Sequence, residues 1–89
     1  LIGMSRSFAL EYGACGIRVN TVMPGLIKTK LADAYDPEQQ ARTIARTPVG
    51  RLGEGEDIGN AVLYLSSPGA AFVTGVSLVV DGGLTIASL

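Results

Sequence analysis

The chain has 89 residues, 47% of them apolar, and its seven basic and eight acidic side chains give a net charge of −1. With no basic stripe and no apolar run near the roughly 20 residues that cross a bilayer, neither a nucleic-acid partner nor a membrane is expected. The absence of His and of a second cysteine beside Cys15 excludes Cys/His metal sites and His-activated nucleophiles, and one cysteine fits a reducing, cytoplasmic location.

The first twelve residues are predicted to form a helix. Leu1, Met4, Phe8 and Tyr12 recur at spacings of three and four, which makes one apolar stripe. Gly13 suits the left-handed residue just past a helix end. No capping residue precedes the periodic positions, so the chain is expected to begin inside a helix.

A strand is predicted over residues 17–22, because IRVNTV is rich in β-branched side chains and alternates. The Met-Pro-Gly that follows is expected to close it, since proline cannot donate to a ladder. Arg18 and Asn20 lie inside this pattern, and polar groups in such positions need partners. They are expected either to organise neighbouring loops or to contact a ligand.

The middle of the chain is polar and mixed, with a short helix expected after Pro37, which suits a first helical turn. A loop, TPVGRLGEGE, precedes a helix predicted over residues 56–66, where apolar side chains recur at spacings of three and four. The run VSLVV, residues 76–80, is apolar on both faces and predicts a buried parallel strand.

This order of elements predicts an α/β fold in which two strands are joined by a right-handed parallel crossover. Parallel sheets are covered on both faces, and two strands with two good helices cannot bury such a sheet well. The chain is therefore expected to be a fragment, or an obligate part, of a larger α/β fold.

The glycine-rich stretch GRLGEGEDIG invites a phosphate-binding interpretation. No strand leads into it, and Glu54, Glu56 and Asp57 would repel a phosphate at the start of the following helix. Capping and turn chemistry explains the stretch better. The carboxylate pairs Asp33/Asp36 and Glu56/Asp57 are likewise interpreted as solvated or dipole-complementing groups rather than as a general acid and base.

The stretch PGLIKT is the strongest local candidate for a ligand site. The ends of parallel strands are where open α/β sheets bind ligands. Gly25 would let a ligand approach the backbone, and amides near Ile27 with the hydroxyl of Thr29 could reach an amide or a phosphate. Position alone leaves two alternatives, a ligand contact and a plain turn.

Three stretches of the sequence together resemble the C-terminal part of a short-chain dehydrogenase/reductase. They are SRSFALEYGACGIRVNTVMPGLIKTK, TPVGRLGEGEDIGNAVLYLSS and FVTGVSLVVDGG. They occur in the order found in the family and cover nearly the whole chain. The resemblance implies that residues 1–89 are the C-terminal segment of one Rossmann-like, doubly wound parallel-sheet domain whose N-terminal cofactor-binding half is absent. The expected order is helix, strand, substrate-loop helices over about 26–47, helix and strand.

The resemblance also implies an oxidoreductase that transfers hydride between NAD or NADP and a small carbonyl or alcohol substrate. It implies cofactor contacts from Pro24, Gly25, Leu26, Ile27 and Thr29, with Thr29 supplying a hydroxyl. Substrate contacts are expected from Leu26, Leu31 and Tyr35 in the substrate loop, which acts as a lid. In this family the last helix and strand commonly build the interface of a homodimer or homotetramer.

The family's catalytic Ser, Tyr and Lys would lie upstream of Leu1, and none of Tyr12, Tyr35 and Tyr64 has a Lys four residues later. No catalytic residue is therefore expected here, and these 89 residues alone are expected to be inactive. The competing hypothesis is a non-catalytic scaffold or nucleotide-sensing relative. A third possibility is a truncated natural product that inserts into a partner's sheet.

Overall fold

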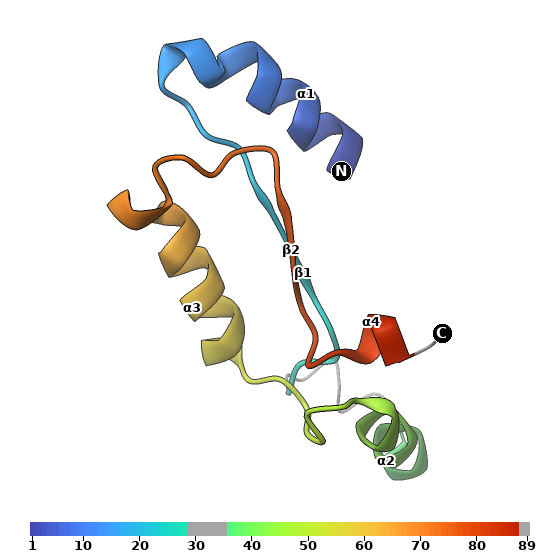
Figure 1. Cartoon of the computed structure of the whole chain (residues 1–89). Coiled ribbons are helices and arrows are strands. Elements are labelled where there is room, and N and C mark those ends of the chain that lie inside the picture. Colours follow the sequence, from blue (N-terminus) through green and yellow to red (C-terminus); the bar gives the residue numbers. More distant parts are fainter. Residues whose placement is uncertain (29–35, 88–89) are drawn as a thin grey trace.

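The computed structural model describes residues 1–28 and 36–87. Two strands run side by side, with one helix along them and further helices at the two ends of the sheet (Figure 1). In chain order the elements are α1 (Ile2–Tyr12), η1 (Gly13–Cys15), β1 (Thr21–Pro24), α2 (Pro37–Arg46), α3 (Gly55–Ser66), η3 (Pro68–Ala70), β2 (Ser77–Val80) and α4 (Leu84–Ala87).

The two strands form a parallel sheet in the register Thr21↔Ser77 to Pro24↔Val80. The predicted α/β fold with a parallel crossover is therefore confirmed. The predicted start of the first strand is wrong, because β1 begins at Thr21 rather than at residue 17. Residues 18–20 instead bind the loop before β2, as when the Val19 amide donates to Thr74 Oγ1 at 3.0 Å. The Ile17 amide donates to Tyr12 at 3.3 Å.

Pro24 is the last residue of β1, so the strand ends within the predicted Met-Pro-Gly stretch, two positions beyond the predicted last residue, Val22. The amides of Thr21 and Gly25 donate to Val76 and Val80 across the sheet. Backbone groups alternate between the two sides of a strand, so the nitrogen of Pro24 faces away from β2. At such a position proline costs no hydrogen bond within this sheet.

Helix α1 agrees with the prediction, but its packed face does not. The buried residues are Ser5 and Ala9, and Ser5 accepts a hydrogen bond from Thr21 Oγ1 at 2.9 Å. The predicted apolar stripe is exposed, with Leu1 at 92%. The left-handed residue is Gly16, with φ 79°, because the 3-10 turn η1 inserts between the helix and that position. Small side chains let the helix approach the sheet closely.

Helices α2 and α3 start where local chemistry predicts. Asp36 caps α2 by accepting a hydrogen bond from the Gln39 amide at 2.8 Å, and Pro37 occupies the first turn. The first turn of α3 contains Glu56 and Asp57, and acidic groups are favourable at that end of a helix. The predicted capping role of this glycine-rich stretch is confirmed.

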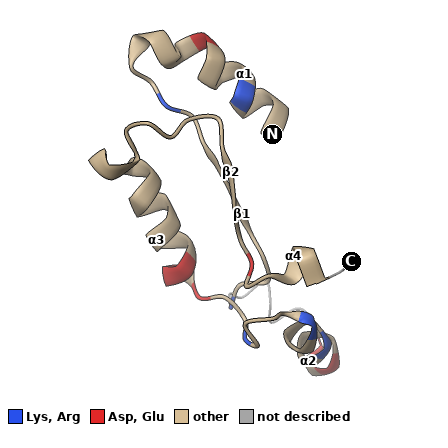
Figure 2. Cartoon of the chain, viewed as in Figure 1, with Lys and Arg blue, Asp and Glu red and all other residues tan. Residues whose placement is uncertain are grey.

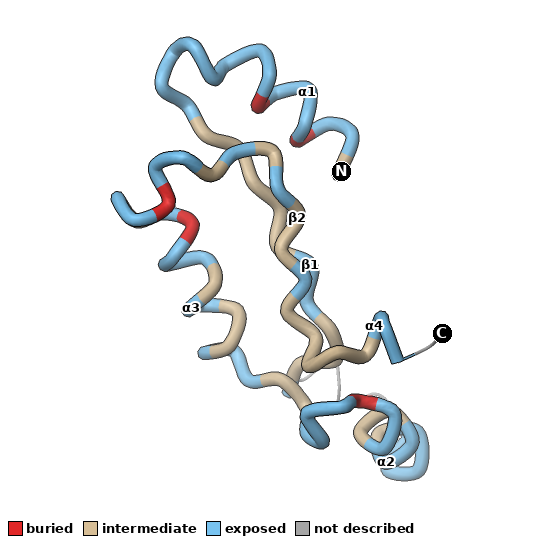
Figure 3. Tube along the Cα trace, in the orientation of Figure 1, coloured by how far each residue is buried: buried red, intermediate tan, exposed pale blue. Residues whose placement is uncertain are grey.

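Burial is slight along the described chain, and most of the trace is exposed or intermediate (Figure 3). Within residues 1–28 and 36–87 the buried apolar side chains are Ala9, Leu65 and Ala70. The chain extends over 49 × 25 × 22 Å. The same residues contain no helix that is long and apolar enough to cross a membrane.

Candidate functional site

The candidate site lies where both strands end. Residues 25–28, called here the strand-end segment, follow β1, and the Asp81-Gly82-Gly83 turn follows β2. The Gly25 amide donates to Val80 at 3.1 Å and so continues the ladder. Two adjacent turns therefore form the carboxyl edge of the parallel sheet. Open α/β folds bind their ligands at this edge.

Gly25 packs directly against the second turn. A Cβ built at Gly25 would lie 2.7 Å from the Cβ and 2.9 Å from the Cα of Asp81. Real side chains do not make such short contacts with backbone atoms, so this position requires glycine. The sequence suggested that Gly25 clears space for a ligand, whereas the described contact is with the protein's own backbone.

The strand-end segment is also bound from its other side by Gly53. The Gly53 amide donates to Leu26 at 2.9 Å, and the Lys28 amide donates to Gly53 at 2.7 Å. This is a parallel bridge centred on Ile27 and Gly53. In that geometry the amide and carbonyl of Ile27 itself point away from Gly53. Among the described residues neither group of Ile27 has a hydrogen-bond partner.

The second turn rests on the loop between α2 and α3. The Val49 amide donates to Gly82 at 3.1 Å. A Cβ at Gly82, whose φ is 64°, would lie 2.9 Å from Thr47 Cγ2. Asp81 accepts hydrogen bonds from the Thr85 hydroxyl and amide and from the Gly83 amide, and these bonds lower the pKa of its carboxyl.

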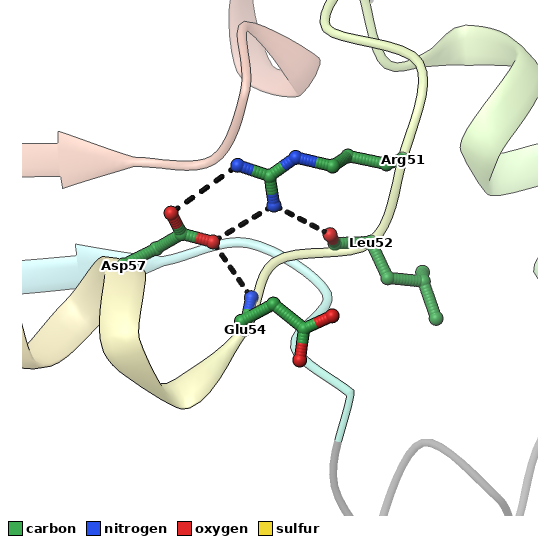
Figure 4. A network of polar contacts seen from close by, with 4 residues as sticks. All are labelled: Arg51, Leu52, Glu54 and Asp57. Atoms are coloured by element: carbon green, nitrogen blue, oxygen red, sulfur yellow. Dashed lines mark hydrogen bonds and ion pairs between the residues drawn. The ribbon is translucent and has the colours of Figure 1, made fainter.

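An ion pair fixes the start of α3 (Figure 4). Arg51 Nη1 and Nη2 donate to the two carboxylate oxygens of Asp57 at 2.8 and 3.2 Å, and Nη1 also donates to the Leu52 carbonyl at 2.9 Å. Asp57 accepts in addition from the Glu54 amide at 2.7 Å. These bonds, called here the Arg51–Asp57 network, lower the pKa of Asp57 to about 2, chiefly through the Arg51 hydrogen bond, and raise that of Arg51.

Two hollows adjoin the strand-end segment. One, of about 210 Å³, lies on the Gly53 side and is lined by Leu26, Ile27, Thr47, Val49, Arg51, Gly53, Asp57, Asn60, Val80, Asp81 and Gly82. The other is an open groove of about 680 Å³ toward α2, lined by Pro24, Gly25, Leu26, Gln39, Arg42, Thr43, Arg46, Asp81, Leu84 and Thr85. Basic residues of α2 lie near this groove (Figure 2). Residues 1–28 and 36–87 contain no cluster of three or more His, Cys, Asp or Glu able to hold a metal.

The structure brings four predicted site residues together at one strand end: Pro24, Gly25, Leu26 and Ile27. Thr29, Leu31 and Tyr35 lie outside the described residues, as does Asp33 of the carboxylate pairs. The sequence did not identify Gly53 as a partner of this segment. Gly53 pairs with Ile27 across 26 positions of sequence, so no local pattern predicts the pairing. The one local feature of Gly53 is that it is a glycine shortly before the start of a helix.

Asn20 and Arg18 lie at the opposite end of the sheet and organise a loop. The Asn20 side chain donates to Val73 and accepts from the Val76 amide, both at 3.1 Å. Arg18 Nη1 donates to the same Val73 carbonyl at 3.1 Å. The sequence left two alternatives for Arg18 and Asn20, organising a loop and contacting a ligand. The described hydrogen bonds support the first.

The sequence of this chain is similar to those of known proteins. A family model described as enoyl-(acyl carrier protein) reductase matches residues 1–85. The 3-oxoacyl-(acyl-carrier-protein) reductase FabG of Vibrio cholerae is 45% identical over 84 residues, which cover 94% of this chain and 34% of that protein. A Xanthobacter autotrophicus protein named inactive 2-(S)-hydroxypropyl-CoM dehydrogenase 2 is 44% identical over 91 residues. The match covers 96% of this chain and 40% of that protein.

Solved structures match as well. A putative 2-deoxy-D-gluconate 3-dehydrogenase from Agrobacterium tumefaciens with bound NADP has a TM-score of 0.91 at 39% identity, covering 96% of this chain and 35% of that one. A 4-hydroxyisoleucine dehydrogenase complexed with NADH has a TM-score of 0.90 at 34% identity, and the match covers 96% of this chain and 36% of that one. The chain spans about a third of the length of the curated relatives it matches. It belongs to the short-chain dehydrogenase/reductase family, and its α/β fold is the C-terminal part of that family's Rossmann-like sheet.

Proposed function

We propose that this chain is the C-terminal segment, residues 1–89, of a single Rossmann-like domain of an NAD(P)-dependent oxidoreductase. The complete enzyme transfers hydride between the nicotinamide and a carbon bearing a carbonyl or hydroxyl. The observation that carries the proposal is the backbone of Ile27. Its amide and carbonyl point away from the Gly53 bridge, at the carboxyl edge of the sheet, and have no partner among the described residues.

The chemistry of that edge fits a nicotinamide. A carboxamide offers one acceptor oxygen and a donor NH₂, and an unpartnered peptide offers the complementary donor and acceptor. Pro24 and Gly25 line the open groove together with Leu26, and they are proposed to form an apolar wall for the ring. In this proposal Leu26 and Ile27 bind the carboxamide, while Thr29 supplies a hydroxyl to the carboxamide or diphosphate. When bound, the cofactor supplies the hydride or accepts it.

Either NAD or NADP is proposed as the cofactor, on the basis of one similar structure with bound NADP and another with NADH. In this family the residues that distinguish the two cofactors follow the second strand of the complete domain, which in this proposal precedes Leu1 and is not β2. The chain's own contribution is to orient the nicotinamide end.

The substrate is proposed to enter from the α2 side. The open groove there is lined by the apolar side chains of Leu26 and Leu84 and by the basic side chain of Arg42, among others. Leu26, Leu31 and Tyr35 are proposed to contact the substrate, with α2 acting as part of a lid. The substrate itself is a small carbonyl or alcohol compound.

The isolated 89 residues are proposed to be inactive, and the complete enzyme to be a homodimer or homotetramer. Large apolar side chains on α1 and α3 are exposed, among them Leu10 at 87% and Leu63 at 68%. A stable domain does not leave such faces open to water. They are proposed to be covered by the rest of the domain and by a second subunit.

Activity of the complete enzyme tests the proposal. We expect oxidation of NADH or NADPH with at least one member of a panel of small ketones and 3-oxoacyl thioesters, and none from the isolated chain. The Thr29→Ala variant should raise the KM for the cofactor or lower kcat while the thermal unfolding temperature stays within about 2 °C, as expected if the hydroxyl serves binding rather than stability. Unchanged kinetics would remove Thr29 from the site.

A non-catalytic role is the second candidate, because a relative named inactive is as similar to this chain as a relative named as a reductase. The relative named inactive is 44% identical to this chain, against 45% for a relative named as a reductase. Similarity over this segment therefore does not separate the two classes. A Tyr-x-x-x-Lys pair encoded a few residues before Leu1 would favour the enzyme. Its absence, together with cofactor binding without turnover, would favour the sensor.

A further inference from the structure

The strand-end segment is held in place from the side opposite to the proposed cofactor. Gly53 binds it through both of its backbone groups, accepting from Lys28 at 2.7 Å and donating to Leu26 at 2.9 Å. A Cβ built at Gly53 would lie 2.5 Å from Ile27 Cδ1, so the Ile27 side chain packs onto Gly53. Any displacement of Gly53 is therefore transmitted to the peptide groups of Ile27.

The peptide groups on both sides of Gly53 are fixed in turn by one ion pair. On the preceding side Arg51 Nη1 donates to the Leu52 carbonyl at 2.9 Å. On the following side the Glu54 amide donates to Asp57 Oδ2 at 2.7 Å. Arg51 and Asp57 bind each other through both carboxylate oxygens, a planar geometry that restricts both side chains (Figure 4).

We propose that Arg51 and Asp57 are positioning residues for the nicotinamide cofactor: through Gly53, their bidentate pair holds the backbone of residues 26–28 where it binds the carboxamide. This inference rests on the proposed function and adds to it two residues that do not touch the cofactor. The Arg51 side chain is 53% exposed and that of Asp57 34%, so solvent screens the pair and its effect on overall stability is small.

Helix capping alone is the simpler explanation, and it makes different predictions. A cap needs Asp57 at the Glu54 amide, but it does not need the arginine that joins Asp57 to the Leu52 carbonyl. If capping were the whole role, Arg51 variants would leave the strand-end segment unchanged. If the pair positions the segment, Arg51 and Asp57 variants should affect the same amides, those of Lys28 and Gly53.

The test uses the complete enzyme with Arg51→Ala, Arg51→Lys and Asp57→Asn. Hydrogen exchange of the Lys28 and Gly53 amides, and the Kd of NADH and NADPH, are measured together. We expect faster exchange at both amides and a Kd raised about threefold to fivefold, the upper part of the range for loss of an exposed pair, with kcat at saturating cofactor within about twofold. Lysine should not restore the wild-type values, because an ammonium lacks the planar fork.

Arg18→Ala is the matched control, since Arg18 also donates to a backbone carbonyl, that of Val73, but at the far end of the sheet. It should change neither the exchange of Lys28 nor the Kd. Wild-type exchange and Kd in Arg51→Ala, or equal effects in Arg18→Ala, would overturn the positioning role. Full rescue by lysine would also overturn it. If the wild-type enzyme binds neither cofactor, the proposed function fails, while the exchange data alone still decide whether the pair holds residues 26–28.

Discussion

A Cβ added to Gly25 would lie 2.7 Å from the Cβ of Asp81 and 2.9 Å from its Cα, so the turns that end the two strands are in direct backbone contact. One turn leads to the proposed nicotinamide wall, and the other carries the carboxylate that organises the start of α4. The glycine is therefore required by the protein's own packing, before any ligand is considered.

Gly25→Ala should destabilise the complete enzyme and weaken its cofactor binding. The added methyl group can be accommodated only by moving backbone, and overpacking of this kind costs about 1–3 kcal/mol. Thermal unfolding and cofactor titration of the same preparation check both effects. Gly59→Ala is the control, because a Cβ there meets nothing within 4 Å and a helix gains about 0.5–1 kcal/mol from the change. An alanine at Gly25 as stable as the wild type would contradict the contact.

Gly55→Pro should stabilise the enzyme by about 0.4–1 kcal/mol, because proline reduces the freedom of the unfolded chain. Gly55 is the first residue of α3, where no intrahelical bond is lost, and Glu54 before it is extended with φ −108° and ψ 157°. Denaturant unfolding measures the gain. The same substitution at Gly59, inside the helix, should cost about 3 kcal/mol. Equal losses at both positions would show that the helix does not begin at Gly55.

Asn20→Ala should lower stability by about 1–3 kcal/mol without changing the Kd of the cofactor. The substitution leaves the Val73 carbonyl and the Val76 amide without the side chain that joins them. Asn20→Asp keeps the acceptor for Val76 but places a carboxylate against the Val73 carbonyl, so it should not restore stability. Denaturant unfolding and cofactor titration separate the two readouts. A large change in Kd with unchanged stability would instead indicate that Asn20 touches the ligand.

The Arg51–Asp57 network predicts a specific dependence on pH. The pKa of Asp57 falls to about 2 in the folded protein, below the value of about 3.9 of an unfolded aspartate. A lowered pKa stabilises the fold above the unfolded value and loses that effect as pH falls through the folded one. The stability difference between wild type and Asp57→Asn should thus be constant near neutral pH and shrink between about pH 4 and 2. A difference that stays constant to pH 3 would contradict the pair.

Helices α2 and α3 were predictable because their signals are local, whereas α4 was not predicted. Asp36 and Pro37 mark the start of α2, and the acidic turn at Glu56 and Asp57 marks that of α3. The first strand was placed too early because Ile17 and Val19 have the residue types of a strand. The Ile17 amide instead donates to Tyr12, and Val19 binds Thr74 and Gly75 in the loop before β2. The Ile27–Gly53 bridge joins distant positions, and no local pattern specifies such a pairing.

The candidate site likewise has a part that the sequence could indicate and a part that depends on contacts between distant residues. The resemblance to the family indicated residues 24–27, and the described structure groups them at one strand end. It could not indicate that Asp81 makes glycine obligatory at position 25, since that contact depends on how two turns meet in space. Apolar periodicity also predicted the wrong packed face of α1. Its buried residues are small: Ser5 accepts a hydrogen bond from Thr21 of β1, and Ala9 lies against Gly75 in the loop before β2.

The central claim is that the strand-end segment forms the nicotinamide side of a cofactor site. The most direct measurement is the amide chemical shift of Ile27 in the complete enzyme with isoleucine-selective nitrogen labelling, titrated with NADH, NADPH and ADP-ribose. ADP-ribose keeps the adenosine and diphosphate but lacks the nicotinamide ring. We predict a large saturable shift of Ile27 with NADH or NADPH and little with ADP-ribose. An Ile27 resonance that stays in place, or that responds equally to ADP-ribose, would contradict the claim.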